Sequence, residues 1–503
     1  MSALWNRSRQ CLSRGSLFPQ RISLTARLTP RQAHLQPHLP SRQTRRELLT
    51  LAIETSCDDT CVAILEKSKT GAARLHFNEK ITSDNRAFRG VHPLTAVVSH
   101  TENLAPLIQK ALRSLPDATC AEEGNRAKAL SVDGHPRLRP DFVSVTRGPG
   151  MTSNLATGLN HAKGLAVAWD VPLLAVNHMQ AHALTPRLVR ALEKQEANPP
   201  QGPTTEAAGN QNLYSPQFPF LSLLVSGGHT MLVHSQSLNE HAVLANALNI
   251  AVGDMMDKCA RMIVPTEVLS AEDSASGMYG PVFEEFAFPG SRASTRYEYN
   301  YVPPARRADE IKTFDSGHGW ILTPPLARMG KTAAATFEFA GLNGQIQKLM
   351  AERPDMDVEM RRVLARAAMT LVFEHLTGRL VFALQSDSEK STDNASSTET
   401  EGRGGIKTIV LSGGVASNKF LRHVVRKMLD ARGYADVEVV APPVSLCTDN
   451  AAMIAWTGME MYEDGWRSDL SVLTLRKWPL DPNAEGGGIL GAGGWYKVLM
   501  AKS

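Results

Sequence analysis

The sequence lacks the features by which secreted and membrane-spanning proteins are usually recognised. Its six cysteines are scattered over 503 residues without a Cys-x-x-Cys pair, and no secretory signal precedes them. We therefore expect free thiols in a reducing compartment rather than a disulfide framework. No uninterrupted apolar run reaches the roughly 18 residues that a spanning helix needs. We expect no membrane-spanning segment.

Acidic residues and lysine are absent from residues 1–46, which carry nine arginines. Such an acid-free, Arg- and Ser-rich N-terminus is typical of a mitochondrial import segment, and a basic tail that binds RNA is the alternative. Removing these nine charges from the net charge of +4 leaves −5 for the rest of the chain. A nucleic-acid partner must then be held by a local basic patch.

Two segments of the chain share one pattern: an apolar strand, a short polar turn ending in Thr, and a second apolar strand. This pattern predicts a hairpin in each half of a duplicated α/β domain, with a cleft between the halves. The two turns are Glu54-Thr55-Ser56-Cys57-Asp58-Asp59-Thr60 and Ser226-Gly227-Gly228-His229-Thr230.

Strands and helices alternate after each hairpin, which favours a largely parallel sheet with ligands at the carboxyl ends of its strands. Expected strands are 141–146, 171–176, 406–411 and 437–441, and expected helices are 153–169, 418–429 and two that begin near 177 and 449. Four stretches rich in Ser, Thr, Gly, Glu and Pro interrupt the pattern, and we expect disordered surface insertions at 195–216, 265–276, 289–320 and 385–405.

His178 and His182 stand four residues apart, where both imidazoles can reach one metal from one face of a helix. A structural or surface pair is the alternative. Zinc proteases with this spacing need Glu directly after the first His, and Met179 stands there instead. Asp449, just before an expected helix, is a candidate third ligand, and its alternative role is the helix N-cap.

Several turns could bind an anion through backbone N–H groups, although a plain hairpin turn is the alternative for each. The candidates are Ser56, Ser226, Gly227 and Gly228, together with the glycine turn at 412–418, which could instead serve close packing of a strand against a helix. Asp58 could bind metal, orient a nucleophile, accept a proton or simply favour the turn.

These motifs together resemble the universal tRNA N6-adenosine threonylcarbamoyltransferase family, and the import segment resembles that of its mitochondrial branch. The similarity runs from about residue 48 to about residue 480. It rests on the two hairpin turns above and on Asn177-His178-Met179-Gln180-Ala181-His182, Ser412-Gly413-Gly414-Val415-Ala416-Ser417-Asn418 and Cys447-Thr448-Asp449-Asn450.

The resemblance implies an actin/Hsp70-like fold of two ribonuclease H-like lobes, with threonylcarbamoyl-adenylate from a separate synthase bound in the cleft. It implies one divalent cation, zinc or iron, on His178, His182 and Asp449. By matching position the adenylate site comprises Leu224, Val225, Ser226, Gly227, Gly228, Asp257, Gly280 and Asn418. Asp58 is our candidate catalytic residue. We expect mitochondrial tRNA to be the acceptor, and we expect the protein to be a homodimer in the mitochondrial matrix.

The chain departs from the family pattern at three motifs. Where the family has Pro-Gly-Gly-Pro, this chain has Met278-Tyr279-Gly280-Pro281. Where the family has Gly-Val-Val-Pro-Glu, it has Gly90-Val91-His92-Pro93-Leu94, and where the family has Ser-Gly-Leu-Lys, it has Ala340-Gly341-Leu342-Asn343. The expected division is an import segment at 1–46, lobes at 47–216 and 217–480, and a tail at 481–503. An actin-like ATPase or kinase is the main rival function, ahead of a metalloprotease or a non-catalytic tRNA-binding subunit.

Overall fold

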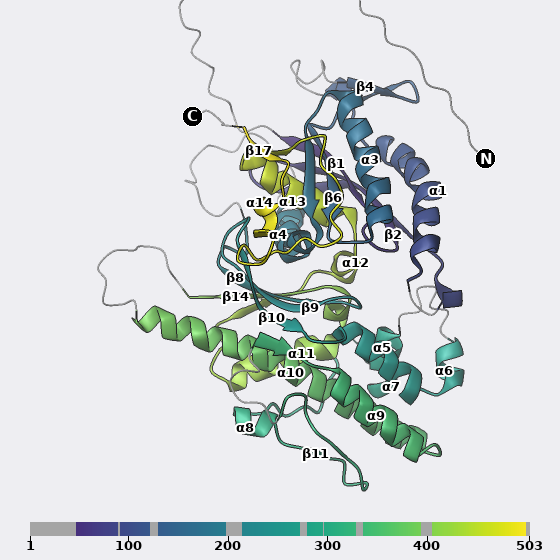
Figure 1. Ribbon diagram of the computed structural model, residues 1–503, viewed down its shortest axis with the longest axis vertical. Helices are drawn as coiled ribbons and strands as arrows, with labels where there is room; N and C mark the ends of the chain where they lie inside the picture. The colour runs from purple at the N-terminus through teal and green to yellow at the C-terminus, as the bar shows by residue number, and fades with distance from the viewer. Residues whose placement is uncertain are drawn as a thin grey trace, which may run out of the picture. The chain divides into compact units, whose positions relative to one another are not determined.

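The computed structural model describes residues 47–88, 91–120, 129–197, 214–271, 279–294, 296–327, 335–393 and 405–498. The expected import segment therefore lies outside the described residues. Within them, the main body is built on a seven-stranded and a six-stranded sheet (Figure 1).

The seven-stranded sheet has the order β17-β16-β7-β6-β1-β2-β3. Strands β1, β2 and β3 form an antiparallel meander. Strand β6 pairs in parallel with β1, and β7 pairs in parallel with β6. The strands are β1 (Leu48–Glu54), β2 (Asp59–Lys67), β3 (Ala73–Thr82), β6 (Phe142–Gly148), β7 (Leu173–Asn177), β16 (Trp466–Ser468) and β17 (Trp495–Lys497).

The six-stranded sheet repeats this plan with the order β13-β10-β9-β8-β14-β15. Strands β8, β9 and β10 form the meander, and β14 and β15 continue in parallel. The strands are β8 (Phe220–Val225), β9 (Thr230–Ser235), β10 (His241–Ala247), β13 (Thr336–Phe337), β14 (Thr408–Ser412) and β15 (Glu438–Val440). The predicted hairpins and the duplication are confirmed.

Helices cover both sheets, because the apolar strands need a partner on each face. Helices α1 (Pro93–Leu112) and α3 (Thr152–Trp169) pack on one face of the first sheet, and α4 (His178–Ala197) and α13 (Ala451–Glu463) on the other (Figure 1). Helix α4 also packs against β8 and β14 of the second sheet. Helix α4 therefore contacts both sheets.

The second sheet packs on a separate core in which α10 is central. The helices of this half are α5 (Val252–Ile263), α6 (Thr266–Ala271), α7 (Gly280–Ala287), α8 (Arg307–Glu310), α9 (Ala340–Glu352), α10 (Val358–Asp393), α11 (Lys419–Ala431) and α12 (Val444–Cys447). One stretch of α10, Val358–Glu389, has the length and mean hydropathy of a membrane span, but 78% of its most apolar window is buried inside the protein. Helix α10 is therefore part of the hydrophobic core of the second half.

Residues 289–294 and 296–320 are ordered, and the expectation of a disordered insertion there is wrong. Tyr299 and Trp320 are buried in the second core, and Glu310 is buried beside Arg379 and Arg432. Aromatic side chains within the polar stretch supply the apolar area that ordering requires. The stretches at 265–276 and 385–405 also begin in helices, α6 and α10, while residues 198–213 lie outside the described part.

After the second sheet is complete, the chain returns to the first. Helix α13 packs against β1, β2, β6 and β7, and β16 pairs with β7 and β17. Short elements complete the described chain: β4 (Ala129–Val132), β5 (His135–Leu138), β11 (Phe314–Asp315), β12 (Ile321–Leu322) and α14 (Gly488–Gly491). The lobe boundaries at 216 and 480 stay a prediction.

Candidate active site

Helix α4 begins directly after β7, and its first turn presents two histidines. The side-chain oxygen of Asn177, the last residue of β7, accepts hydrogen bonds from the backbone N–H groups of Met179 and Gln180 at 2.9 and 3.1 Å. These bonds satisfy groups that a helix leaves unpaired at its start. His178 and His182 lie on one face of this helix, with ring centroids 4.7 Å apart.

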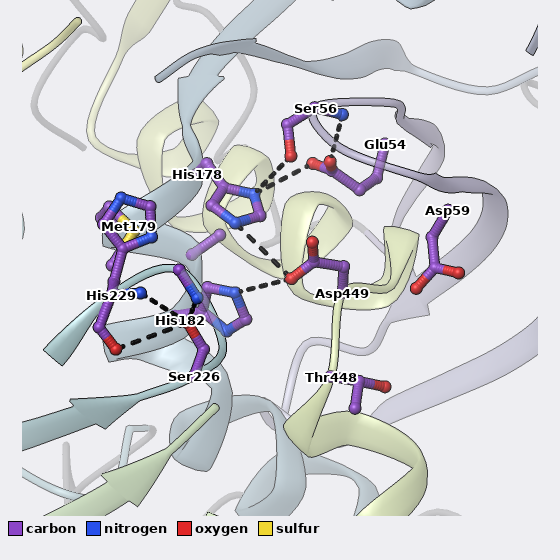
Figure 2. Close-up of polar contacts among 12 residues, drawn as sticks. Glu54, Ser56, Asp59, His178, Met179, His182, Ser226, His229, Thr448 and Asp449 are labelled. Carbon is purple, nitrogen blue, oxygen red and sulfur yellow. Dashed lines mark hydrogen bonds and ion pairs between the residues drawn. The ribbon is translucent and has the colours of Figure 1, made fainter. Parts of the chain in front are cut away.

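Asp449 joins this pair from the loop that precedes α13. Its Oδ1 atom lies 3.0 Å from Nε2 of His182 and 3.6 Å from Nε2 of His178 (Figure 2). The N-cap of α13 is Asn450, whose side chain accepts from the backbone N–H of Met453 at 3.0 Å. The alternative that Asp449 serves as the helix cap is therefore wrong.

The three side chains fit a divalent cation. Their ligand atoms all lie within 4.8 Å of one another. Ligands about 2.1 Å from a tetrahedral zinc are about 3.4 Å apart, close to the two distances from Asp449. Two imidazoles and one carboxylate suit zinc or iron, and such a set leaves a position for substrate.

Charge in the cluster favours a cation. Burial opposes the charged form of His178, but the carboxylates of Asp449 and Glu54 outweigh it and raise the pKa of His178 to about 9. Burial likewise opposes ionisation of Asp449, and the two histidines outweigh it and lower the pKa of that carboxyl. Without a metal, a proton on His178 thus balances the negative charge of these carboxylates, and a bound cation would take over that role.

Glu54 is a candidate functional residue that we did not single out from the sequence. It ends β1, is fully buried, and accepts from Nδ1 of His178 at 3.3 Å, from the backbone N–H of Ser56 at 2.6 Å and from the hydroxyl of Thr146. A carboxylate behind a metal-binding histidine orients the ring and makes it a better ligand. The signal was an acid at the end of an otherwise apolar strand.

Asp58 lies in the first hairpin turn and is not part of the group formed by His178, His182 and Asp449. Its carboxylate lies 3.4 Å from the side-chain amide of Asn85, and its backbone oxygen accepts from Ser83 at 3.0 Å. Burial, followed by repulsion from Asp59 and Asp449, raises the pKa of Asp58. A carboxylate with a raised pKa is a stronger base. Asp59 instead pairs with Lys80 at 2.7 Å.

The second hairpin turn offers bare backbone. Among the described residues, no atom lies within 4 Å of where a Cβ would stand on Gly227 or Gly228, so both border open space. The Ser226 hydroxyl is used within the turn, where it accepts from the backbone N–H groups of Gly228 at 3.3 Å and His229 at 3.0 Å. Backbone N–H groups beside open space suit a phosphate.

Close packing fixes the base of this turn. A Cβ on Gly413, which has a φ of +95°, would lie 2.4 Å from the backbone oxygen of Val225. One on Gly253, at the start of α5, would lie 2.7 Å from the oxygen of Ser226. The side chains of Leu224 and Val225 are buried in the core. These two residues can therefore face a ligand only through their backbone.

Asp257 lies in the middle of α5, whereas Gly280 begins α7 and Asn418 is the N-cap of α11. Asp257 accepts from the backbone N–H of Tyr279 at 2.8 Å, directly before α7, and burial raises the pKa of its carboxyl. Gly280 borders open space within the described residues. Asn418 caps α11 by accepting from Leu421 at 2.9 Å, which leaves its amide nitrogen as a donor. Asp257 and Gly280 are thus brought together.

Comparison with known proteins decides the family. A family model described as tRNA N6-adenosine threonylcarbamoyltransferase matches residues 134–216 and 203–456. The chain is 32% identical over 449 residues to a mitochondrial tRNA N6-adenosine threonylcarbamoyltransferase from Schizosaccharomyces pombe, covering 87% of each chain. The chain belongs to the tRNA N6-adenosine threonylcarbamoyltransferase family.

Bacterial members of the threonylcarbamoyltransferase family match over a similar span. The chain is 30% identical to the enzyme of Novosphingobium aromaticivorans, covering 87% of this chain and 97% of that one. The protein is therefore a transferase of this family. Its two matched sheets have the actin/Hsp70-like arrangement of two ribonuclease H-like lobes.

Two solved structures resemble parts of this threonylcarbamoyltransferase only distantly. YeaZ from Pseudomonas aeruginosa is 17% identical with a TM-score of 0.21, covering 39% of this chain and 67% of that one. HypF from T. kodakarensis is 12% identical with a TM-score of 0.39, covering 84% and 48%. The fold assignment rests on the sheet topology and the family.

Proposed function

We propose that this protein transfers the threonylcarbamoyl group from threonylcarbamoyl-adenylate to N6 of the adenosine 3′-adjacent to the anticodon, position 37, in mitochondrial tRNAs that read codons beginning with adenine. AMP is the second product. The observation that carries the proposal is the convergence of His178, His182 and Asp449 beside the second hairpin turn, whose His229 lies near enough to interact electrostatically with all three (Figure 2).

The adenylate would be held by its phosphate and its ribose. The backbone N–H of Gly227 suits the phosphate, and so does that of Gly228 if it exchanges its bond to the Ser226 hydroxyl for one to the phosphate, on which negative charge grows as AMP leaves. The carboxylate of Asp257 suits the two ribose hydroxyls, with Gly280 leaving room beside it. Leu224, Val225 and Ser226 contribute backbone, and the amide nitrogen of Asn418 is the remaining donor.

The acceptor amine attacks the carbamoyl carbon. A new C–N bond forms, the bond between that carbon and the phosphate oxygen breaks, and the electron pair leaves with AMP. An adenine N6 amine is a poor nucleophile, so the loss of its proton must accompany the attack. Asp58, whose pKa is raised by burial and by nearby carboxylates, is our candidate to accept that proton or to orient the amine.

His178, His182 and Asp449 would hold one divalent cation, zinc or iron. When bound, the cation supplies positive charge that polarises or clamps the threonylcarbamoyl group. Glu54 keeps Nε2 of His178 directed at the site by binding Nδ1. An actin-like ATPase or kinase is disfavoured, because enzymes of that type hold magnesium through carboxylates, phosphates and water.

The mitochondrial setting and the assembly are also proposals. The acid-free segment at 1–46 and the similarity to a mitochondrial enzyme of Schizosaccharomyces pombe support import into the matrix. Threonylcarbamoyl-adenylate would come from a separate synthase, and we expect the transferase to act as a homodimer.

Mass spectrometry of nucleosides tests the reaction directly. Unmodified tRNA is incubated with the protein, threonylcarbamoyl-adenylate and zinc or iron, then digested. We expect threonylcarbamoyladenosine at position 37 and one AMP released per modified tRNA. Hydrolysis of the adenylate without any modified nucleoside would contradict the proposal.

A further inference from the structure

Two aromatic rings stack at the entrance to α1. The ring of Phe88 lies parallel to that of His92, with centroids 3.9 Å apart and planes 8° apart. Phe88 is 52% exposed. Since one face of the Phe88 ring rests on His92, the other is open to solvent. His92 belongs to the segment in which this chain departs from the family pattern.

The ring of His92 and the backbone of Phe88 are held in place, and the Phe88 ring rests on that of His92. Nδ1 of His92 lies 3.0 Å from the hydroxyl of Thr95 and accepts from its backbone N–H at 3.4 Å, which caps α1. The backbone N–H of Phe88 donates to the backbone oxygen of Asn85 at 3.0 Å. An exposed ring that is already immobilised loses little entropy when a flat ligand stacks on it.

Asn85 connects the Phe88–His92 stack to the first hairpin turn. The side-chain oxygen of Asn85 accepts from the backbone N–H of His92 at 3.0 Å, and its amide nitrogen lies 3.4 Å from the carboxylate of Asp58. Asn85 is buried. One fixed side chain therefore sets the spacing between the open face of Phe88 and our candidate proton acceptor.

We propose that the Phe88–His92 stack is the platform for the acceptor adenine of the tRNA. Unpaired bases of RNA loops are recognised by stacking on aromatic side chains as well as by contacts to their edges. An adenine stacked on Phe88 would lie on the segment that Asn85 ties to Asp58. This inference rests on the proposed function, because it names the acceptor subsite of that reaction.

An anticodon stem-loop RNA with 2-aminopurine at position 37 tests the platform without turnover, since 2-aminopurine lacks the N6 amine. We expect its fluorescence to be quenched by the wild-type protein and by Phe88→Trp, but not by Phe88→Ala. With natural tRNA, Phe88→Ala should raise KM for tRNA about tenfold. The affinity for the adenylate should be unchanged.

Leu94→Ala is the matched control, because Leu94 is an exposed apolar residue of the first turn of α1 outside the stack. It should leave quenching and KM at wild-type values. Undiminished quenching by Phe88→Ala, or an unchanged KM, would overturn the platform while leaving the transferase activity standing. A wild-type protein that makes no threonylcarbamoyladenosine would instead overturn the proposed function.

Discussion

Adjacent residues at the start of α13 divide two tasks that one residue could have combined. Asn450 caps the helix, and Asp449 faces His178 and His182. A cap requires only a hydrogen-bond acceptor, whereas a cation also requires negative charge. The two tasks can therefore be separated by mutation.

Asp449→Asn should lose bound metal and transferase activity while keeping the melting temperature of the metal-free protein, because the amide removes the charge but not the shape. Asn450→Ala should retain metal and lose about 1 kcal/mol of stability with the cap. Metal content per chain and thermal melting distinguish the pair. A fully metallated, active Asp449→Asn protein would refute the cluster as a metal site.

Glu54→Gln addresses the residue behind His178. The amide keeps the volume of the buried side chain but lacks the charge that orients and polarises the imidazole, so metal affinity should fall by about 10- to 100-fold. Competition with a chelator measures this affinity. His182 has no hydrogen-bond partner for its buried Nδ1 within the described residues, so it offers no equivalent support. An unchanged affinity would show that Glu54 serves only the fold.

Asp257→Asn should weaken adenylate binding by about 1.5–3 kcal/mol, because the ribose hydroxyls lose a charged acceptor. The amide oxygen can still accept from Tyr279, so the start of α7 should survive. Calorimetric titration with a non-hydrolysable adenylate analogue measures the loss, and Asp257→Ala reports the cost of removing both roles. Wild-type affinity in Asp257→Asn would place the ribose elsewhere.

Among the elements, the hairpins and the β-to-α turns were predictable, because apolar runs ending in Gly, Ser or Asp leave few alternatives. Strand β8 and the turn at Gly227 illustrate this. That residues 289–294 and 296–320 are ordered was not predictable, because their ordering depends on tertiary burial of a few aromatic residues such as Trp320. The hydrogen bond by which Glu54 supports His178 was missed for a similar reason, because Thr146 and His178, the partners of Glu54, are distant from it in the sequence.

Gly253→Ala tests how α5 positions the second hairpin turn. Its Cβ would lie 2.7 Å from the Ser226 oxygen and 2.8 Å from the Cα of Gly227, so the helix and the turn must move apart. We expect a loss of about 1–3 kcal/mol of stability and reduced transferase activity.

Gly164→Ala is the matched control, because Gly164 lies in α3 with no described atom within 4 Å of the added Cβ. It should raise stability by up to about 1 kcal/mol through helix propensity. Thermal melting and tRNA modification are measured on both variants. Equal behaviour of the two alanines would contradict the packing argument.

For the whole molecule, the sequence predicted the family and the duplicated plan, because several separated motifs occur in a fixed order. It did not reveal that the chain returns to the first sheet. Strands β16 and β17 have three residues each, too short for an alternating pattern to stand out.

Residues 1–46 should direct import, because they carry nine arginines and no acid. Fused to a fluorescent protein, they should place it in mitochondria. A variant with glutamate at half of the arginines is the control and should remain cytosolic. A diffuse signal from the unaltered segment would contradict the prediction.

The late return of the chain constrains the order in which the molecule can be completed. Helix α13, with the fully buried Trp456, covers the sheet that begins at β1. A polypeptide synthesised N-terminus first presents β1 and β2 about 400 residues before this covering helix is made. Until that stretch has been made, only α4 of the two helices covers this face of the first sheet, so the nascent lobe would depend on chaperones to keep it from aggregating.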